Sequence, residues 1–116
     1  MDSSIAAIAR RSAAQFGPQV AMELEVLLAG AEAGQPLQYM DTGTKLALAS
    51  LIVAVAQFAW QIHGDISKAG GTPSVEAVER RVLIRLEQEG RLLPLPQRDT
   101  AIRRTVEETL IEIDSE

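Results

Sequence analysis

Residues 46–62 read LALASLIVAVAQFAWQI and contain no charged side chain, and this run decides the fold. Asp41-Thr42-Gly43 precedes it with turn and capping residues, and His63-Gly64-Asp65 and then Ala69-Gly70-Gly71 follow it. We therefore expect one long central helix that begins near residue 42 and ends near His63. At 1.5 Å per residue, the uncharged run is roughly 25 Å long, slightly short of a hydrocarbon core of about 30 Å.

The central helix has two unequal faces on a helical wheel. The broad one, the apolar face, is a candidate surface for self-association and consists of Leu48, Leu51, Ile52, Val55, Phe58 and Ile62. The narrow one, the polar seam, carries small or polar side chains and consists of Ala47, Ser50, Ala54, Gln57 and Gln61.

Three uses of this helix fit the pattern. In water, the apolar face is buried by the other helices of a bundle or by a second copy of the chain, and the polar seam is the solvated strip. In a bilayer, the polar seam faces another helix, while Lys45, Lys68 and Trp60 lie near the interfaces. A third use is exchange between the two states. The short span and the glutamines favour water, whereas the lack of charge favours lipid.

Capping residues, prolines and glycines around apolar positions at helical spacing predict further helices. Their expected ranges are 4–16, 18–31, 73–89 and 99–113. The expected fold class is all-α with about five helices, of which the last two form a C-terminal amphipathic hairpin. Residues 92–96 (LLPLP) are expected to be an extended connection within it, because each proline disfavours helix in the residue before it.

Gly70-Gly71-Thr72-Pro73 is a candidate boundary between two parts of the chain. The first part, residues 1–69, holds the N-terminal helices and the central helix, and the second, residues 72–116, holds the hairpin. We expect the two parts to pack as one compact domain.

The composition argues against several function classes. The chain has 116 residues and no cysteine, which excludes disulfide frameworks and thiolate metal sites. Its net charge is −5 and neither half has a positive excess, so we expect no nucleic-acid partner. The N-terminal residues lack a signal-peptide pattern, and the expected location is the cytoplasm. In the membrane alternative it is the inner membrane, and Lys68, Arg80 and Arg81 keep the hairpin in the cytoplasm.

The residue pattern indicates no catalytic chemistry. His63 is the only histidine, and Asp65 could orient it as a general base. Its expected position at the end of the central helix instead favours a capping role, because a helix C-terminus attracts positive charge. We expect no enzyme activity, no cofactor and no metal site.

Arginines on the expected hairpin form a candidate charged face: Arg80, Arg81, Arg85, Arg103 and Arg104. Together they could hold a phosphate or an acidic partner. Glutamates are interleaved at helical spacing, however, so pairs such as Glu76 with Arg80, and pairs across the hairpin, account for the same residues. The interleaving favours pairing, and a mixed-charge interaction face is the alternative.

Three segments carry a resemblance to known proteins: residues 48–66 (LASLIVAVAQFAWQIHGDI), 78–88 (VERRVLIRLEQ) and 103–113 (RRTVEETLIEI). With the Gly/Pro joint between the first two, the chain resembles small uncharacterised bacterial helical proteins that have a central hydrophobic segment and are associated with conflict or defence loci. The resemblance spans about residues 46–113 and carries over no catalytic residue. It implies an accessory or effector protein whose central helix docks a partner or enters a membrane.

The functional expectation is a non-catalytic helical interaction or oligomerisation module, an adaptor that self-associates through the central helix and also binds another protein. The alternative is a membrane-inserted anchor or a small membrane-disrupting effector of a bacterial defence system.

Overall fold

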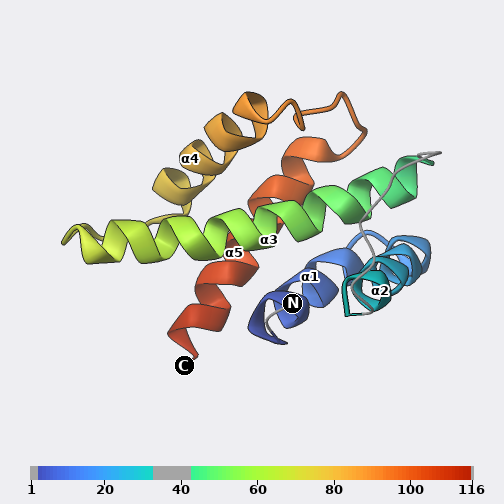
Figure 1. Cartoon of the computed structure of the whole chain (residues 1–116), viewed down its shortest axis with the longest axis horizontal. Coiled ribbons are helices and arrows are strands. Elements are labelled where there is room, and N and C mark those ends of the chain that lie inside the picture. Colours follow the sequence, from blue (N-terminus) through green and yellow to red (C-terminus); the bar gives the residue numbers. More distant parts are fainter. Residues whose placement is uncertain (1–2, 33–42, 116) are drawn as a thin grey trace.

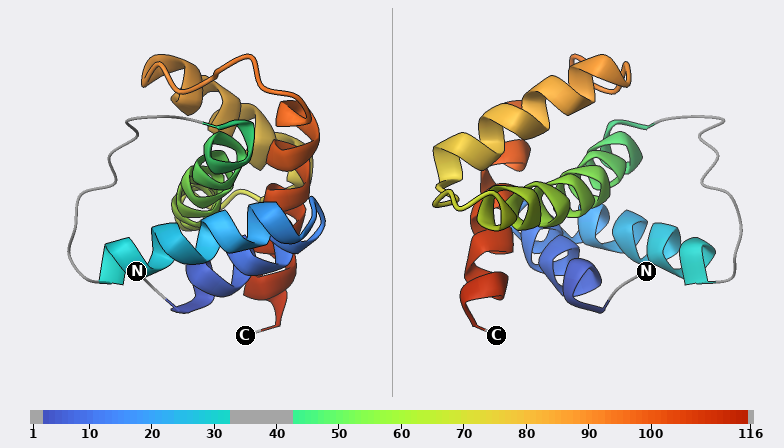
Figure 2. Two further views of the ribbon diagram at one scale, coloured as in Figure 1. Left: turned by 90° about the vertical axis from the view of Figure 1, so that its right-hand side faces the viewer. Right: turned by 60° about the vertical axis from the view of Figure 1, so that its left-hand side comes forward.

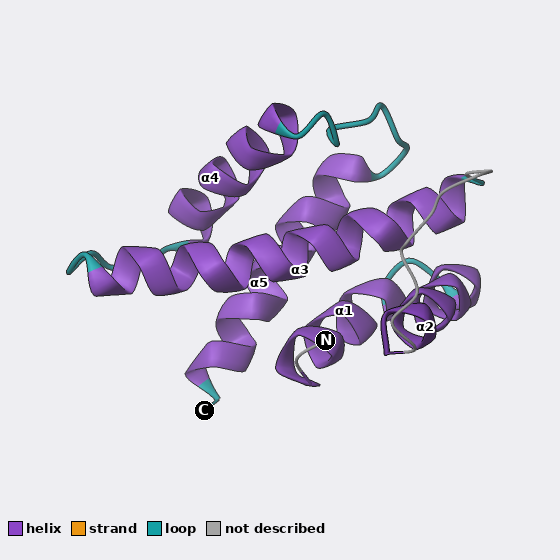
Figure 3. Cartoon of the chain, in the orientation of Figure 1, coloured by secondary structure: helices purple, strands orange, loops and turns teal. Residues whose placement is uncertain are grey.

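The long central helix is present as α3, which spans Thr44–Lys68 and runs along the length of the molecule (Figure 1). The computed structural model describes residues 3–32 and 43–115, and these residues form five helices and no strand (Figure 3). The other helices are α1 (Ser3–Ala14), α2 (Pro18–Glu32), α4 (Val75–Gln88) and α5 (Arg98–Asp114). The all-α fold with a long apolar central helix is thereby confirmed.

Helix α3 contacts each of the other four helices. Helices α1 and α2 lie on one side of it, α4 lies on the opposite side, and α5 crosses it (Figures 1 and 2). Its buried side chains pack against apolar residues of its neighbours, among them Leu24 of α2, Val82 of α4 and Ile102 of α5. Each large aliphatic side chain fully buried in this way contributes about 1.5–3 kcal/mol, so the covering helices are held mainly by this contact.

Local sequence determines where α4 begins and ends. The Ser74 hydroxyl accepts a hydrogen bond from the Ala77 N–H at 3.1 Å, which caps the first turn. Gly90 adopts φ 67°, and the N–H of Arg91 donates to the Leu86 carbonyl at 2.8 Å, which closes the last turn. Gly70 ends α3 in the same way, with φ 84° and a bond from the Gly71 N–H to the Ile66 carbonyl.

The expected helix ends lie within two residues of those in the structure, except the end of α3, which is wrong. Helix α3 continues past His63 and Gly64 to Lys68, so His63 does not cap the helix, and the basic residue of its last turn is Lys68. The extra turn is held because Ile66 is buried in the core. Helix α5 begins one residue before Asp99, after Gln97, which is in the left-handed region at φ 63°. The expected caps Asp41 and Thr42 lie outside the described residues.

The C-terminal hairpin is tied to the N-terminal half through α5, which contacts α1 as well as α3. The Arg11 guanidinium donates to Glu108 and to Glu112, each at 2.8 Å, and so links α1 to α5. The buried faces of α1 and α5 carry small and hydroxyl side chains. These include Ala9 and Ser12 of α1 and Ala101 and Thr105 of α5. Side chains of this size let two helices approach closely.

Candidate functional site

The apolar face of α3 lies inside the folded chain. Its six residues have exposed fractions between 0 and 7%. All six belong to the one hydrophobic core that α3 forms with the other helices. In this conformation they therefore stabilise the fold and do not form a surface that a second copy could reach.

The polar seam is not a continuous solvated strip. Ala47 and Ala54 are buried, Ser50 and Gln57 are half-buried, and only Gln61 is exposed. The Ser50 hydroxyl donates to the Leu46 carbonyl of its own helix at 3.0 Å. Gln61 accepts a hydrogen bond from Arg85 at 3.1 Å, so this end of the seam connects α3 to α4.

Of the five arginines of the candidate charged face, Arg80 and Arg81 are exposed and Arg104 lies 3.9 Å from Glu107 on its own helix. The Arg85 guanidinium lies 4.5 Å from the centre of the Phe58 ring and also bonds Glu89 at 3.3 Å. Arg103 of α5 bonds Glu79 at 3.1 Å and Glu76 at 3.4 Å, both on α4. The expected pairing across the hairpin thus forms at Arg103. Glu76 bonds Arg103 and not Arg80, because α5 brings the guanidinium alongside the start of α4.

These ion pairs shift the pKa values of two groups on the hairpin. The hydrogen bond to Glu79 is the main cause that raises the pKa of Arg103 above its ordinary value. The pKa of Glu76 is lowered, first by a hydrogen bond from its own backbone N–H and then by the Arg103 guanidinium. The charges of Arg103 are therefore engaged within the chain, which argues against this residue as a free anion-binding group.

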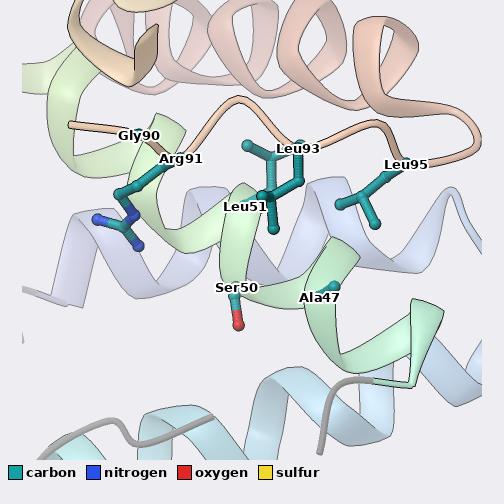
Figure 4. A pocket seen from close by; sticks show the side chains of 7 residues that line it. All are labelled: Ala47, Ser50, Leu51, Gly90, Arg91, Leu93 and Leu95. Atoms are coloured by element: carbon teal, nitrogen blue, oxygen red, sulfur yellow. The ribbon is translucent and has the colours of Figure 1, made fainter. Parts of the chain in front are cut away.

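A partly enclosed apolar cavity lies between the N-terminal half of α3 and the connection from α4 to α5 (Figure 4). Its volume is about 190 Å³. Its lining consists of Ala47, Ser50, Leu51, Gly90, Arg91, Leu93 and Leu95. In Figure 4 the side chains of Leu93 and Leu95 extend from the connection toward α3, and the Ser50 hydroxyl points away from these leucines.

The connection supplies the half of this cavity that sequence reasoning missed. Residues 92–96 consist of three leucines and two prolines, and the prolines prevent the leucines from entering a helix. Leu93 consequently remains 47% exposed at the cavity wall. The leucines themselves could have indicated this wall. They lie in a segment without helical or strand periodicity, so no predicted helix or strand buries them.

Among the residues that the structure describes, Arg91 is the only charged one in the lining of this cavity. Within residues 3–32 and 43–115, its side chain takes part in no hydrogen bond or ion pair, whereas the neighbouring Arg98 bonds Asp99 and the Leu93 carbonyl. The cavity therefore combines an apolar wall with a guanidinium group whose donors are available.

Two other kinds of site, a metal site and a membrane-spanning helix, have less support. Among the described residues, no group of three or more histidine, cysteine or acidic side chains is placed to hold a metal ion. By length and composition, helix α3 could cross a membrane. However, 67% of its most apolar stretch of 18 residues is buried inside the chain. The same properties occur in core helices of water-soluble proteins.

No protein-family model, curated protein or solved structure matches this chain.

Proposed function

We propose that the chain is a non-catalytic helical interaction module that docks a protein partner at the cavity between α3 and the connection from α4 to α5. The single observation that carries this proposal is the cavity itself, in which Leu51, Leu93 and Leu95 line an opening of about 190 Å³. An apolar cavity of roughly 150 Å³ can hold a benzene-sized group. One large apolar side chain of a partner is therefore of suitable size.

The rigid half of the site is built on α3. Ala47 and Leu51 are buried and fixed by the core, while Leu93 is exposed and lies on a segment without helical structure. A site of this kind offers a preformed wall, and only the connection needs to adjust when a partner binds. The core position of α3 thus serves the proposed function by holding one wall of the cavity in place.

A selection from a random peptide library displayed on phage tests this proposal. Peptides enriched on the wild-type chain should contain Leu, Phe or Met and should lose most of their binding to Leu93→Ser. The matched control is Ile111→Ser, which removes a hydrophobic side chain that is 55% exposed on α5 and does not line the cavity. Equal binding to both variants, or no enrichment, would contradict the proposal.

The proposal includes self-association, but on a different surface from the apolar face. Met22 and Val26 follow one another at i and i+4 on α2 and are 69% and 66% exposed. A second copy would meet exposed residues of this kind, because the apolar face is occupied by the core. Light scattering during size exclusion tests this part. A dimer that Met22→Ser with Val26→Ser converts to a monomer supports it, and a wild-type monomer at all concentrations contradicts it.

The second candidate function is a membrane-inserted anchor or a small membrane-disrupting effector of a bacterial defence system. The observation that favours it is the 25-residue length of α3 together with a mean hydropathy of 1.6 in its most apolar window. A helix of that length covers about 37 Å, which exceeds a hydrocarbon core of about 30 Å. Recovery of the chain only in alkaline-resistant membranes, with leakage of dye-loaded vesicles, would favour this function over the first.

A further inference from the structure

We propose that Arg91 makes the cavity selective for a segment of another protein in which a carboxylate neighbours a large apolar side chain. This inference rests on the proposed function, because it names the chemistry of the partner at the same site. The apolar side chain enters between Leu51, Leu93 and Leu95, and the carboxylate accepts hydrogen bonds from the Arg91 guanidinium.

The charge distribution around the cavity supports the binding of a carboxylate by Arg91. Within the described residues, the lining contains one cation and no acidic side chain. Arg85, Arg98 and Arg103 each bond a carboxylate of the chain, whereas Arg91 bonds none within residues 3–32 and 43–115. An arginine next to an apolar wall binds a carboxylate through two parallel N–H donors, and these bonds are stronger where water is partly excluded.

The size of the cavity favours a protein segment over a free amphiphile. Pockets for drug-sized ligands usually begin at roughly 300 Å³. The cavity measures about 190 Å³, which suits one side chain. In addition, the chain carries a net charge of −5, so a general attraction to anionic membranes is not expected and selection must come from the local guanidinium.

A matched pair of small probes tests the inference. We would titrate the 15N-labelled chain with 1-hexanol and with hexanoate and follow the amide signals of Ala47, Leu51 and Leu95 by NMR. Hexanoate should bind about three- to tenfold more tightly than hexanol, as expected for one partly exposed charge-assisted contact. Arg91→Gln should remove this preference, mainly by weakening the binding of hexanoate. The control Arg81→Gln, at an exposed arginine outside the cavity lining, should retain it.

The outcomes of this titration distinguish the role of Arg91 from the docking cavity itself. Equal binding of hexanol and hexanoate overturns the role of Arg91 and leaves the docking cavity in place. Failure of both probes to shift these amides overturns the cavity as a docking site and the inference with it. Dimerisation that Arg91→Gln abolishes would assign the carboxylate to a second copy of the chain, and would overturn the assignment to a different protein.

Discussion

At the residue scale, two buried hydroxyl groups act against the stability of the core. Ser12 and Thr105 are fully buried, and neither side-chain oxygen has a hydrogen-bond partner in the part of the chain that the structure describes. The nearby Thr109 hydroxyl, by contrast, donates to the Thr105 carbonyl at 2.8 Å. Burial of a polar group without a partner costs free energy that an apolar replacement of similar size does not.

Ser12→Ala should therefore leave the free energy of unfolding unchanged or raise it by up to about 1 kcal/mol, because it removes an unpaired hydroxyl and little volume. Urea denaturation followed by circular dichroism measures this change. Thr109→Val is the control, since it removes a hydrogen bond that is formed, and it should lower the free energy by about 0.5–1.5 kcal/mol. Destabilisation by Ser12→Ala greater than that of the control would show that the Ser12 hydroxyl has a partner.

Gly64 is a third residue that lowers the stability of the fold. It lies within α3, and a Cβ atom added there would meet no atom within 4 Å. Gly64→Ala should raise the free energy of unfolding by about 0.5–1 kcal/mol, since alanine loses less backbone entropy in a helix. The same substitution at Gly70, whose φ is 84°, should destabilise. Thermal unfolding of both variants measures the contrast, and a stabilised Gly70→Ala would contradict it.

The lowered pKa of Glu76 predicts a pH dependence. A carboxyl group whose pKa is lower in the folded chain stabilises the fold above the pKa of its unfolded form, and this contribution is lost as the pH falls through the folded pKa. Arg103→Gln should raise the pKa of Glu76 toward the ordinary glutamate value, although the bond from its own backbone N–H keeps part of the shift. An NMR titration of the side-chain carboxyl measures it. An unchanged midpoint would exclude the ion pair.

At the element scale, α3 connects the apolar sequence to the whole core. A residue in its middle, Val55, is fully buried, whereas Ser67 in its last turn is exposed. Val55→Arg and Ser67→Arg add the same side chain to the same helix, so a comparison of the two variants separates the effect of burial from any general effect of arginine.

Val55→Arg should unfold the chain or cost at least about 3 kcal/mol, because it places an unpaired charge in the core. Ser67→Arg should have little effect, since a cation suits the end of a helix. Circular dichroism during thermal unfolding, with size exclusion of each variant, gives the comparison. A Val55→Arg variant as stable as Ser67→Arg would mean that α3 is not covered by the other helices.

The sequence predicted the elements well wherever one local rule was sufficient. The uncharged run 46–62 predicted a long helix, and the expected ranges 18–31 and 99–113 lie within one residue of the ends of α2 and α5. The predicted end of α3 is wrong, because His63 and Gly64 do not stop the helix. Burial of Ile66 extends the helix to Lys68, and Gly70, two residues beyond, adopts the left-handed backbone conformation that favours glycine. Tertiary contact thus outweighed a local signal.

At the scale of the whole molecule, the candidate site depends on parts of the chain far apart in sequence. Leu51 of α3 and Leu93 of the connection line the same cavity because α4 and α5 both pack against α3. Helical periodicity orients a side chain around its own axis but does not place one helix relative to another. For the same reason the sequence left open whether other helices of the chain, a second copy or lipid cover the apolar face, which lies in the core that α3 forms with the other helices.

We expect the chain's own helices to bury α3 when the chain is in water. Amide hydrogen exchange of the purified chain in detergent-free buffer tests it most directly. The amides of residues 52–62 should exchange slowest, together with those around Ile102 and Val106, because these residues share one core and are released only by global unfolding. Amides of α3 that exchange as fast as those at the ends of the chain, and become protected only when lipid vesicles are added, would contradict it.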